Sequence, residues 1–191
     1  MKNKLLSAVL LTTSLYASNS VDININNDTL EVGAELYLNN KYNLNNSSNY
    51  YFIANYLHNE GDDNEPNKSL STLGFKVMNP YTDDNGISLG LGIKSTYTSQ
   101  LDKSFIAIPL SVYVRYELNE MIYFNFEYGY APSVLTYQDG EKFQDIKFKA
   151  NYKVLDDGYI YAGIRDIRTT YEPDLEVEYD TSAFVGFNVR F

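Results

Sequence analysis

Residues 182–191, with the sequence SAFVGFNVRF, alternate between two faces up to the last residue. Gly186, Asn188 and Arg190 separate the final hydrophobic residues. A period of two residues is the period of a β-strand whose faces meet different surroundings. The apolar face carries Ala183, Val185, Phe187, Val189 and Phe191. We therefore expect a regular strand that stays paired to its end.

The same alternation recurs along the chain and predicts an all-β protein. In residues 29–38, for example, Leu30 and Val32 lie on one face, whereas Glu31 and Glu35 lie on the other. The segments with clear alternation are 29–38, 86–97, 105–118, 121–131, 143–154 and 158–166. Segments 50–58 and 69–79 alternate less regularly, and we expect them to be strands too.

Three features favour a closed antiparallel transmembrane β-barrel over a soluble β-sandwich. The segments are 9–14 residues long, whereas a bilayer-crossing strand needs about 9–11 residues and an average strand has about 5–6. The second face mixes glycine and serine with charged residues, as a narrow filled interior requires. Tyrosines stand at the ends of the apolar stripes, where aromatic girdles of membrane barrels lie. These tyrosines are Tyr97, Tyr116, Tyr128, Tyr130 and Tyr152.

The loops give the expected number of strands. Short turns at 118–121 and 155–158 suit the periplasmic side, and longer polar stretches at 59–68, 98–103, 136–141 and 172–178 suit the outside. Stretches 39–49 and 79–86 are then periplasmic. Strand 29–38 runs inward in this scheme, so an earlier strand must precede it, and residues 21–27 supply one. The count is ten strands, with eight as the alternative if 21–27 is only a tail.

Residues 1–17 are predicted to be a cleaved signal peptide. Lys2 and Lys4 form a positive start, residues 5–11 are apolar, and small Ala17 suits a cleavage site. We expect residues 18–191 to form the barrel domain. Cleavage changes the net charge from −10 to −12, which argues against a nucleic-acid partner. The chain has no cysteine, so disulfides and thiol chemistry are excluded.

Three stretches together resemble the YfaZ family of outer-membrane proteins: YYFIANYLHNEGDD (50–63), YFNFEYGYAPSVL (123–135) and AFVGFNVRF (183–191). The resemblance runs from about Tyr50 to Phe191. It implies a small barrel in the outer membrane of a Gram-negative bacterium, and it brings no catalytic residues because the family has no assigned activity. Barrels similar to OmpX, OmpW and OmpA are the neighbouring alternatives.

The end of the chain also resembles the β-signal that the bacterial outer-membrane assembly machinery reads. Phe187, Val189 and Phe191 match it. The expected partners are therefore this machinery and periplasmic chaperones, followed by outer-membrane lipid and lipopolysaccharide. We expect a monomer and no cofactor.

Charged residues on the second face would point into the barrel. A barrel of about eight strands is filled by its own side chains, and a buried unpaired charge is costly. We therefore favour a plug of ion pairs, with a narrow pore for small solutes or ions as the alternative. The expected network comprises Glu35, Lys76, Lys94, Arg115, Glu127, Lys147, Lys149, Arg165 and Arg190.

One ion pair of this network can be predicted from the 118–121 turn. Matched faces pair Leu118 with Ile122 and Arg115 with Asn125. Glu127 then lies diagonal to Arg115, within reach of two long side chains. We expect Arg115 to be the partner of Glu127.

Other chemistry has less support. His58 and Ser69 or Ser71 could form a base and nucleophile for a lipid-modifying enzyme, but the sequence shows no complete triad motif. The acidic stretches 59–65 and 172–180 could bind divalent cations, although neither has EF-hand spacing. The sequence thus predicts a non-enzymatic barrel with a structural or surface-interaction role.

Overall fold

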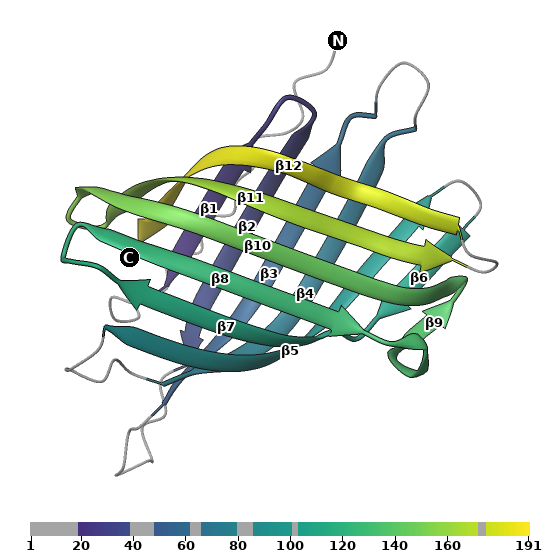
Figure 1. Ribbon diagram of the computed structural model, residues 1–191, viewed down its shortest axis with the longest axis horizontal. Coiled ribbons are helices and arrows are strands. Elements are labelled where there is room, and N and C mark those ends of the chain that lie inside the picture. Colours follow the sequence, from purple (N-terminus) through teal and green to yellow (C-terminus); the bar gives the residue numbers. More distant parts are fainter. Residues whose placement is uncertain (1–18, 39–47, 62–65, 80–85, 101–102, 172–174) are drawn as a thin grey trace.

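The computed structural model describes residues 19–38, 48–61, 66–79, 86–100, 103–171 and 175–191. Its regular elements are β-strands and one short 3-10 turn (Figure 1). The strands are β1 (Ser20–Ile25), β2 (Thr29–Leu38), β3 (Asn49–Asn59), β4 (Lys68–Met78), β5 (Ile87–Gln100), β6 (Lys103–Ala107), β7 (Leu110–Glu117), β8 (Ile122–Ala131), β9 (Thr136–Gln138), β10 (Gly140–Leu155), β11 (Gly158–Tyr171) and β12 (Leu175–Arg190), with the turn η1 (Ser133–Leu135) before β9. The predicted signal peptide and most of stretch 39–49 lie outside the described residues.

Ten of these strands close into an antiparallel barrel. Their order around the ring is β1, β2, β3, β4, β5, β7, β8, β10, β11 and β12, and β1 pairs with β12 to complete it. Val21 lies opposite Val189 and Ile23 opposite Phe187. The backbone of Phe191 exchanges two hydrogen bonds with Asn19, at 2.9 and 3.1 Å. The prediction of ten strands is confirmed, and the alternative of eight is wrong because residues 20–25 form a paired strand.

The segment 105–118 differs from its prediction as one strand. The break falls between β6 and β7, at Ile108 and Pro109. Pro109 has no backbone N–H and cannot donate to a ladder. Its carbonyl still accepts from the N–H of Lys94 at 3.1 Å, while Ile108 donates to Leu135 at 2.8 Å. Beyond this break β6 pairs with β5 and with β9, and so extends the wall at one end.

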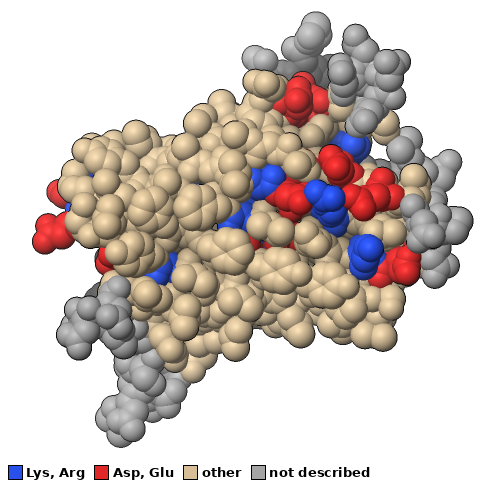
Figure 2. All heavy atoms as spheres, viewed as in Figure 1, with Lys and Arg blue, Asp and Glu red and all other residues tan. Residues whose placement is uncertain are grey.

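The outward face is an apolar belt. Leu91 is 62% exposed and Phe75 55% exposed. Large apolar side chains with this exposure on the outside of a closed barrel are typical of a surface that faces lipid. The predicted girdle residues Tyr97, Tyr116, Tyr128, Tyr130 and Tyr152 are among the exposed large side chains. Figure 2 shows a broad uncharged surface, with most charged side chains over the half toward one end of the barrel and a few at the opposite end. No helix among the described residues has the length and apolarity to cross a membrane.

The two ends of the barrel differ, and we call the end that holds Phe191 the periplasmic end, after the orientation expected from the loop lengths. The turn between β7 and β8 lies there, where Leu118 donates to the carbonyl of Ile122 at 3.0 Å. The side chain of Asn119 accepts from the N–H groups of Met121 and Ile122, both at 2.9 Å. Asparagine commonly closes turns in this way. The predicted register of Arg115 with Asn125 is confirmed.

Candidate functional site: the barrel interior

The interior is divided into three zones along the barrel axis. An apolar zone lies at the outer end, a zone of buried ion pairs lies below it, and a cavity reaches the periplasmic end. The inward positions alternate with the lipid-facing belt, so one register fixes both faces.

The outer zone is a cluster of buried apolar side chains, which we call the outer cap. Phe105 of β6 lies at its centre with 0% exposure. Its ring centroid is 5.8 Å from those of Phe143 and Tyr171, and 6.1 Å from that of Tyr179. The hydroxyls of the two tyrosines are 2.9 Å apart and share a hydrogen bond. The cap comprises Leu57, Leu70, Phe105, Ala107, Ala131, Phe143, Ile167, Tyr171 and Tyr179.

The second zone, the charged layer, is held by three cations. Arg165 of β11 has a side chain with 0% exposure. It donates to Asp180 at 2.5 Å, to Glu31 at 2.8 Å and to the side-chain oxygen of Asn24 at 2.6 Å. These bonds join β11 to β12, β2 and β1, so one guanidinium ties together the strands at the seam of the barrel. The layer comprises Glu31, Lys94, Glu127, Asp145, Lys147, Arg165 and Asp180.

The two lysines of this layer reach across the lumen. Lys94 of β5 bonds Glu127 of β8 and, at 3.0 Å, Asp145 of β10. Lys147 of β10 bonds Glu31 of β2 at 2.5 Å. The lysine side chains are long enough to leave their own wall, and carboxylates on other strands satisfy their charge. The layer therefore closes the cross-section with bonds between strands that are not neighbours.

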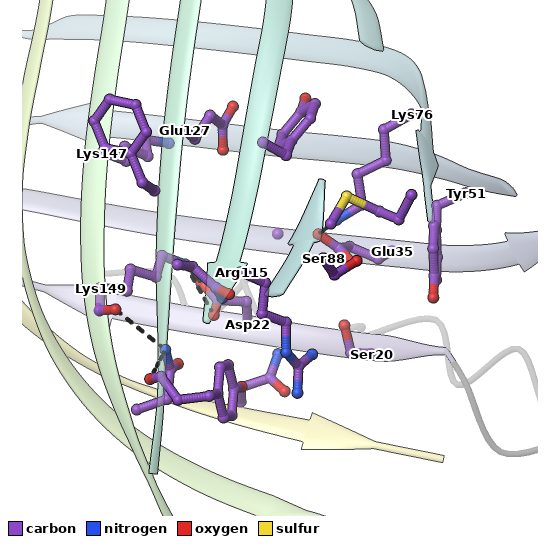
Figure 3. Close-up of a pocket in the computed structure, with 18 of the residues that line it drawn as sticks. Ser20, Asp22, Glu35, Tyr51, Lys76, Ser88, Arg115, Glu127, Lys147 and Lys149 are labelled. Carbon is purple, nitrogen blue, oxygen red and sulfur yellow. Dashed lines mark hydrogen bonds and ion pairs between the residues drawn. The ribbon is translucent and has the colours of Figure 1, made fainter. Parts of the chain in front are cut away.

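Below the charged layer lies a cavity of about 370 Å³. Three ion pairs stand around its wall: Lys76 with Glu35 at 2.5 Å, Arg115 with Glu117 at 2.7 Å, and Lys149 with Asp22 at 3.3 Å. Figure 3 shows the labelled cavity residues Asp22, Glu35, Tyr51, Lys76, Arg115 and Lys149.

Each of these cations also lies over a tyrosine ring. Lys76 Nζ is 5.1 Å from the ring centre of Tyr51, and Arg115 Cζ is 3.9 Å from that of Tyr123. Lys149 Nζ is 4.6 Å from the ring centre of Tyr161. These distances are in the range of cation–π interactions. The rings limit how far each cation can swing into the cavity.

At the periplasmic rim Arg190 of β12 lies against two tyrosines. Its guanidinium donates to the hydroxyls of Tyr159 and Tyr123, at 3.3 and 3.2 Å. Its Cζ atom is 4.4 Å from the ring centre of Tyr159. This arrangement leaves the guanidinium stacked on aromatic faces at the mouth of the cavity.

The structure places all nine residues of the expected network on inward positions, but it does not join them as one network. Lys94, Glu127, Lys147 and Arg165 belong to the charged layer. The other five predicted residues line the cavity: Glu35, Lys76, Arg115, Lys149 and Arg190.

The expected pair of Arg115 and Glu127 is wrong. Glu127 bonds Lys94, and Arg115 bonds Glu117 two positions further along its own strand. The register was as expected, but Lys94 reaches Glu127 across the lumen, whereas Arg115 lies nearer the rim. At the rim, the guanidinium of Arg115 reaches the carboxylate of Glu117 without extending into the buried interior.

Five acidic partners were missed: Asp22, Glu31, Glu117, Asp145 and Asp180. The first four could have been found from parity, because they alternate with lipid-facing residues. Asp180 could not, because a bulge opposite Ile167 and Arg168 shifts the register of β12 and turns Tyr179 and Asp180 both toward the interior.

His58 and Ser69 meet on the lipid-facing side. His58 Nδ1 is 2.8 Å from Ser69 Oγ, and the hydroxyl of Tyr56 donates to the same oxygen at 3.3 Å. Ser71 instead lies opposite Tyr56. Within the described ranges His58 has no second hydrogen-bond partner, so the third member of a triad is not part of this arrangement.

Metal ligands do not gather in the part of the chain that the structure describes: no three histidine, aspartate or glutamate side chains there are placed to hold a metal ion. Much of the two acidic stretches, residues 62–65 and 172–174, lies outside the described residues. Divalent-cation binding by these stretches stays a prediction.

No family model and no curated protein matches the chain. Among solved structures it is similar to the NanC porin, with 10% identity, a TM-score of 0.48 and coverage of 91% of this chain and 99% of that one. It is also similar to the KdgM porin, with 12% identity, a TM-score of 0.44 and coverage of 90% and 99%. OmpT of Vibrio cholerae matches at 11% identity and a TM-score of 0.42 over 85% of this chain, which spans 56% of that protein. At these identities the likeness concerns the fold alone.

Proposed function

We propose that this protein is a closed, non-conducting β-barrel of the outer membrane of a Gram-negative bacterium, with a structural or surface-interaction role. The observation that carries the proposal is that the outer cap lies above the charged layer, and together they fill the lumen. A hydrated ion on its way through would have to separate buried ion pairs and then cross an apolar zone. Both steps are costly in a low-dielectric interior.

The proposal predicts that the wild-type protein does not conduct. Purified protein inserted into planar lipid bilayers should give no single-channel current steps at voltages at which the protein-free bilayer does not leak. A shift of gel mobility on boiling should show that the same preparation is folded, and a general porin should conduct in the same bilayers. Regular steps from the folded protein would overturn the closed barrel in favour of the narrow pore.

The proposal includes export through a signal peptide that is cleaved after Ala17. The first residue of the described ladder is Asn19, whose backbone bonds that of Phe191. Cleavage at Ala17 would therefore remove nothing that the described barrel uses. N-terminal sequencing of the mature protein tests this point, and a mature chain that starts after Asn19 would contradict it.

We also propose that Phe187, Val189 and Phe191 act as the assembly signal, consistent with the resemblance to YfaZ outer-membrane proteins. Phe191 is 49% exposed at the periplasmic end of the belt. The expected partners are the assembly machinery, periplasmic chaperones, outer-membrane lipid and lipopolysaccharide, and we propose that the barrel is a monomer.

Deletion of Phe191 should separate assembly from stability. We expect lower outer-membrane levels and more periplasmic degradation in cells, but near-normal stability in micelles, because one exposed interfacial aromatic and the terminal pair of backbone hydrogen bonds with Asn19 stabilise a finished barrel only modestly. Membrane fractions and refolding yields measure the two effects. Normal membrane levels would contradict the signal, and a joint collapse of both would make Phe191 chiefly a packing residue.

A further inference from the structure

The cavity below the charged layer is closed at its inner end, and it is large enough for a small molecule. Its volume of about 370 Å³ lies in the range of about 300–1,000 Å³ that small-molecule sites occupy. The lining reaches from Glu31 and Lys147 of the charged layer to Ser20, Met78 and Arg190 at the periplasmic strand ends. A solute can thus enter from the periplasmic end and meets a wall of ion pairs at the other.

The acidic residues of the lining are all neutralised. Five acidic and five basic residues line the cavity, and every acid is bonded to a lysine or arginine. Glu127 bonds Lys94, which lies above the cavity, and Arg190 at the rim bonds the hydroxyls of Tyr159 and Tyr123. The pairs that face the cavity are also fixed by tyrosine rings, as for Lys76 on Tyr51 and Arg115 on Tyr123. A charged ligand would have to break one of these pairs or remain without a counter-charge. The lining therefore favours an uncharged ligand.

Two amide groups of the lining are available for hydrogen bonds. Asn55 of β3 and Asn125 of β8 line the cavity, and four positions around the ten-strand ring separate these strands, so the amides lie on opposite walls. Within the described residues neither side chain has a hydrogen-bond partner. Each amide offers two donor hydrogens and an acceptor oxygen, which suits the hydroxyl groups of a ligand between them.

The glycine at position 92 lets two side chains of the lining, those of Tyr113 and Lys76, lie close to the backbone. A Cβ atom at Gly92 would lie 2.9 Å from the ring of Tyr113 and 3.3 Å from Cβ of Lys76. Glycine at this position lets the ring and the lysine stem lie flat against the wall. Tyr51, Tyr113 and Tyr123 are the aromatic residues of the cavity lining that lie beside its cations.

We propose that this cavity binds a small uncharged polyhydroxylated solute, of the size of a monosaccharide, from the periplasmic side. Hydroxyl groups would bond the amides of Asn55 and Asn125 and the outer atoms of the paired ions. The C–H faces of the solute would pack on the tyrosine rings. The inference does not depend on whether the barrel conducts, because the ligand contacts lie on one side of the charged layer.

The experiment uses three solutes with the same sugar ring: glucose, which is uncharged, glucuronate, which is an anion, and protonated glucosamine, which is a cation. Titration calorimetry on the folded protein is done in a detergent without a sugar headgroup, and tyrosine fluorescence follows the same titration because the chain has 19 tyrosines and no tryptophan. We expect saturable glucose binding and about tenfold weaker binding of both charged analogues, since the carboxylates of the lining and the cations Lys76, Arg115 and Lys149 are already held in ion pairs. No glucose binding, or tighter binding of a charged analogue, would overturn the proposal.

Variants place the site in the cavity. Asn125→Ala and Asn55→Ala should each weaken glucose binding about fivefold, as expected for the loss of one hydrogen-bonding group. Thr169→Ala, on a buried inward position of β11 toward the outer end, is the control and should bind as wild type. Unchanged binding in both asparagine variants would overturn the site. Conductance with intact glucose binding would overturn the closed barrel and leave this site standing.

Discussion

Replacement of Arg165 by leucine is expected to lower the free energy of unfolding by about 3–5 kcal/mol, the cost typical of removing one partner from a buried ion pair. Arg165 neutralises Glu31 and Asp180 and also bonds Asn24. Leucine would leave Asp180 buried without its cation. Lys147 would still neutralise Glu31, so most of the loss should come from the Asp180 side.

A matched control lies three residues further along the same strand. Arg168 also bonds two carboxylates, Asp166 at 2.6 Å and Glu176 at 2.8 Å, but its side chain is 33% exposed. Because exposed ion pairs contribute about 0–1 kcal/mol, Arg168→Leu should change stability little. Urea unfolding in micelles, followed by tyrosine fluorescence, measures both variants. Equal midpoints for the two variants would show that the charged layer is not a buried network.

The strand count was predictable from the sequence because bacterial barrels have an even number of antiparallel strands. Long and short loops fixed the direction of each strand, and that scheme required the weak segment 21–27, which the structure shows as β1. The break at Pro109 was not predicted, although proline is confined to edges and irregularities of sheets. The alternation on both sides of Pro109 stays in phase, so the pattern alone gave no sign of the break.

The inward charges were predictable, whereas their partners were not. Alternation decides which face a side chain occupies, and that placed Lys94, Glu127 and Arg165 inward. Pairing across the lumen depends on the stagger and width of the closed barrel. Neighbouring strands therefore suggested Arg115 for Glu127, while the structure joins Glu127 to Lys94 of β5, which is not adjacent to β8.

The outer cap was missed although the sequence carried its signal. Segments 50–58 and 69–79 alternate poorly, and the structure shows why. Leu57 of β3 and Leu70 of β4 point into the cap, while Phe52 and Leu73 on the same strands face lipid. A strand with apolar residues on both faces lacks the two-residue alternation of apolar and polar side chains. In a barrel, the inward apolar residues of such a strand mark the level at which the lumen excludes water.

The cap leads to the second large effect, at Phe105. Phe105→Ala removes a fully buried ring that packs against Phe143, Tyr171 and Tyr179. Substitutions of buried phenylalanine by alanine cost about 3–5 kcal/mol, from lost burial and from the cavity left behind. We expect a loss of this size. β6 is short and is held by its pairing with β5 and β9, so the damage should concentrate at the outer end.

The lipid-facing Phe75→Ala is the control, because that ring is 55% exposed and leaves no enclosed cavity when it is removed. Urea midpoints in micelles should fall far more for Phe105→Ala than for Phe75→Ala. Phe105→Ala should give no current steps in planar bilayers, because Lys94, Lys147 and Arg165 still close the lumen below the cap. Conducting steps in this variant would mean that the cap alone seals the barrel and that the charged layer lets ions pass.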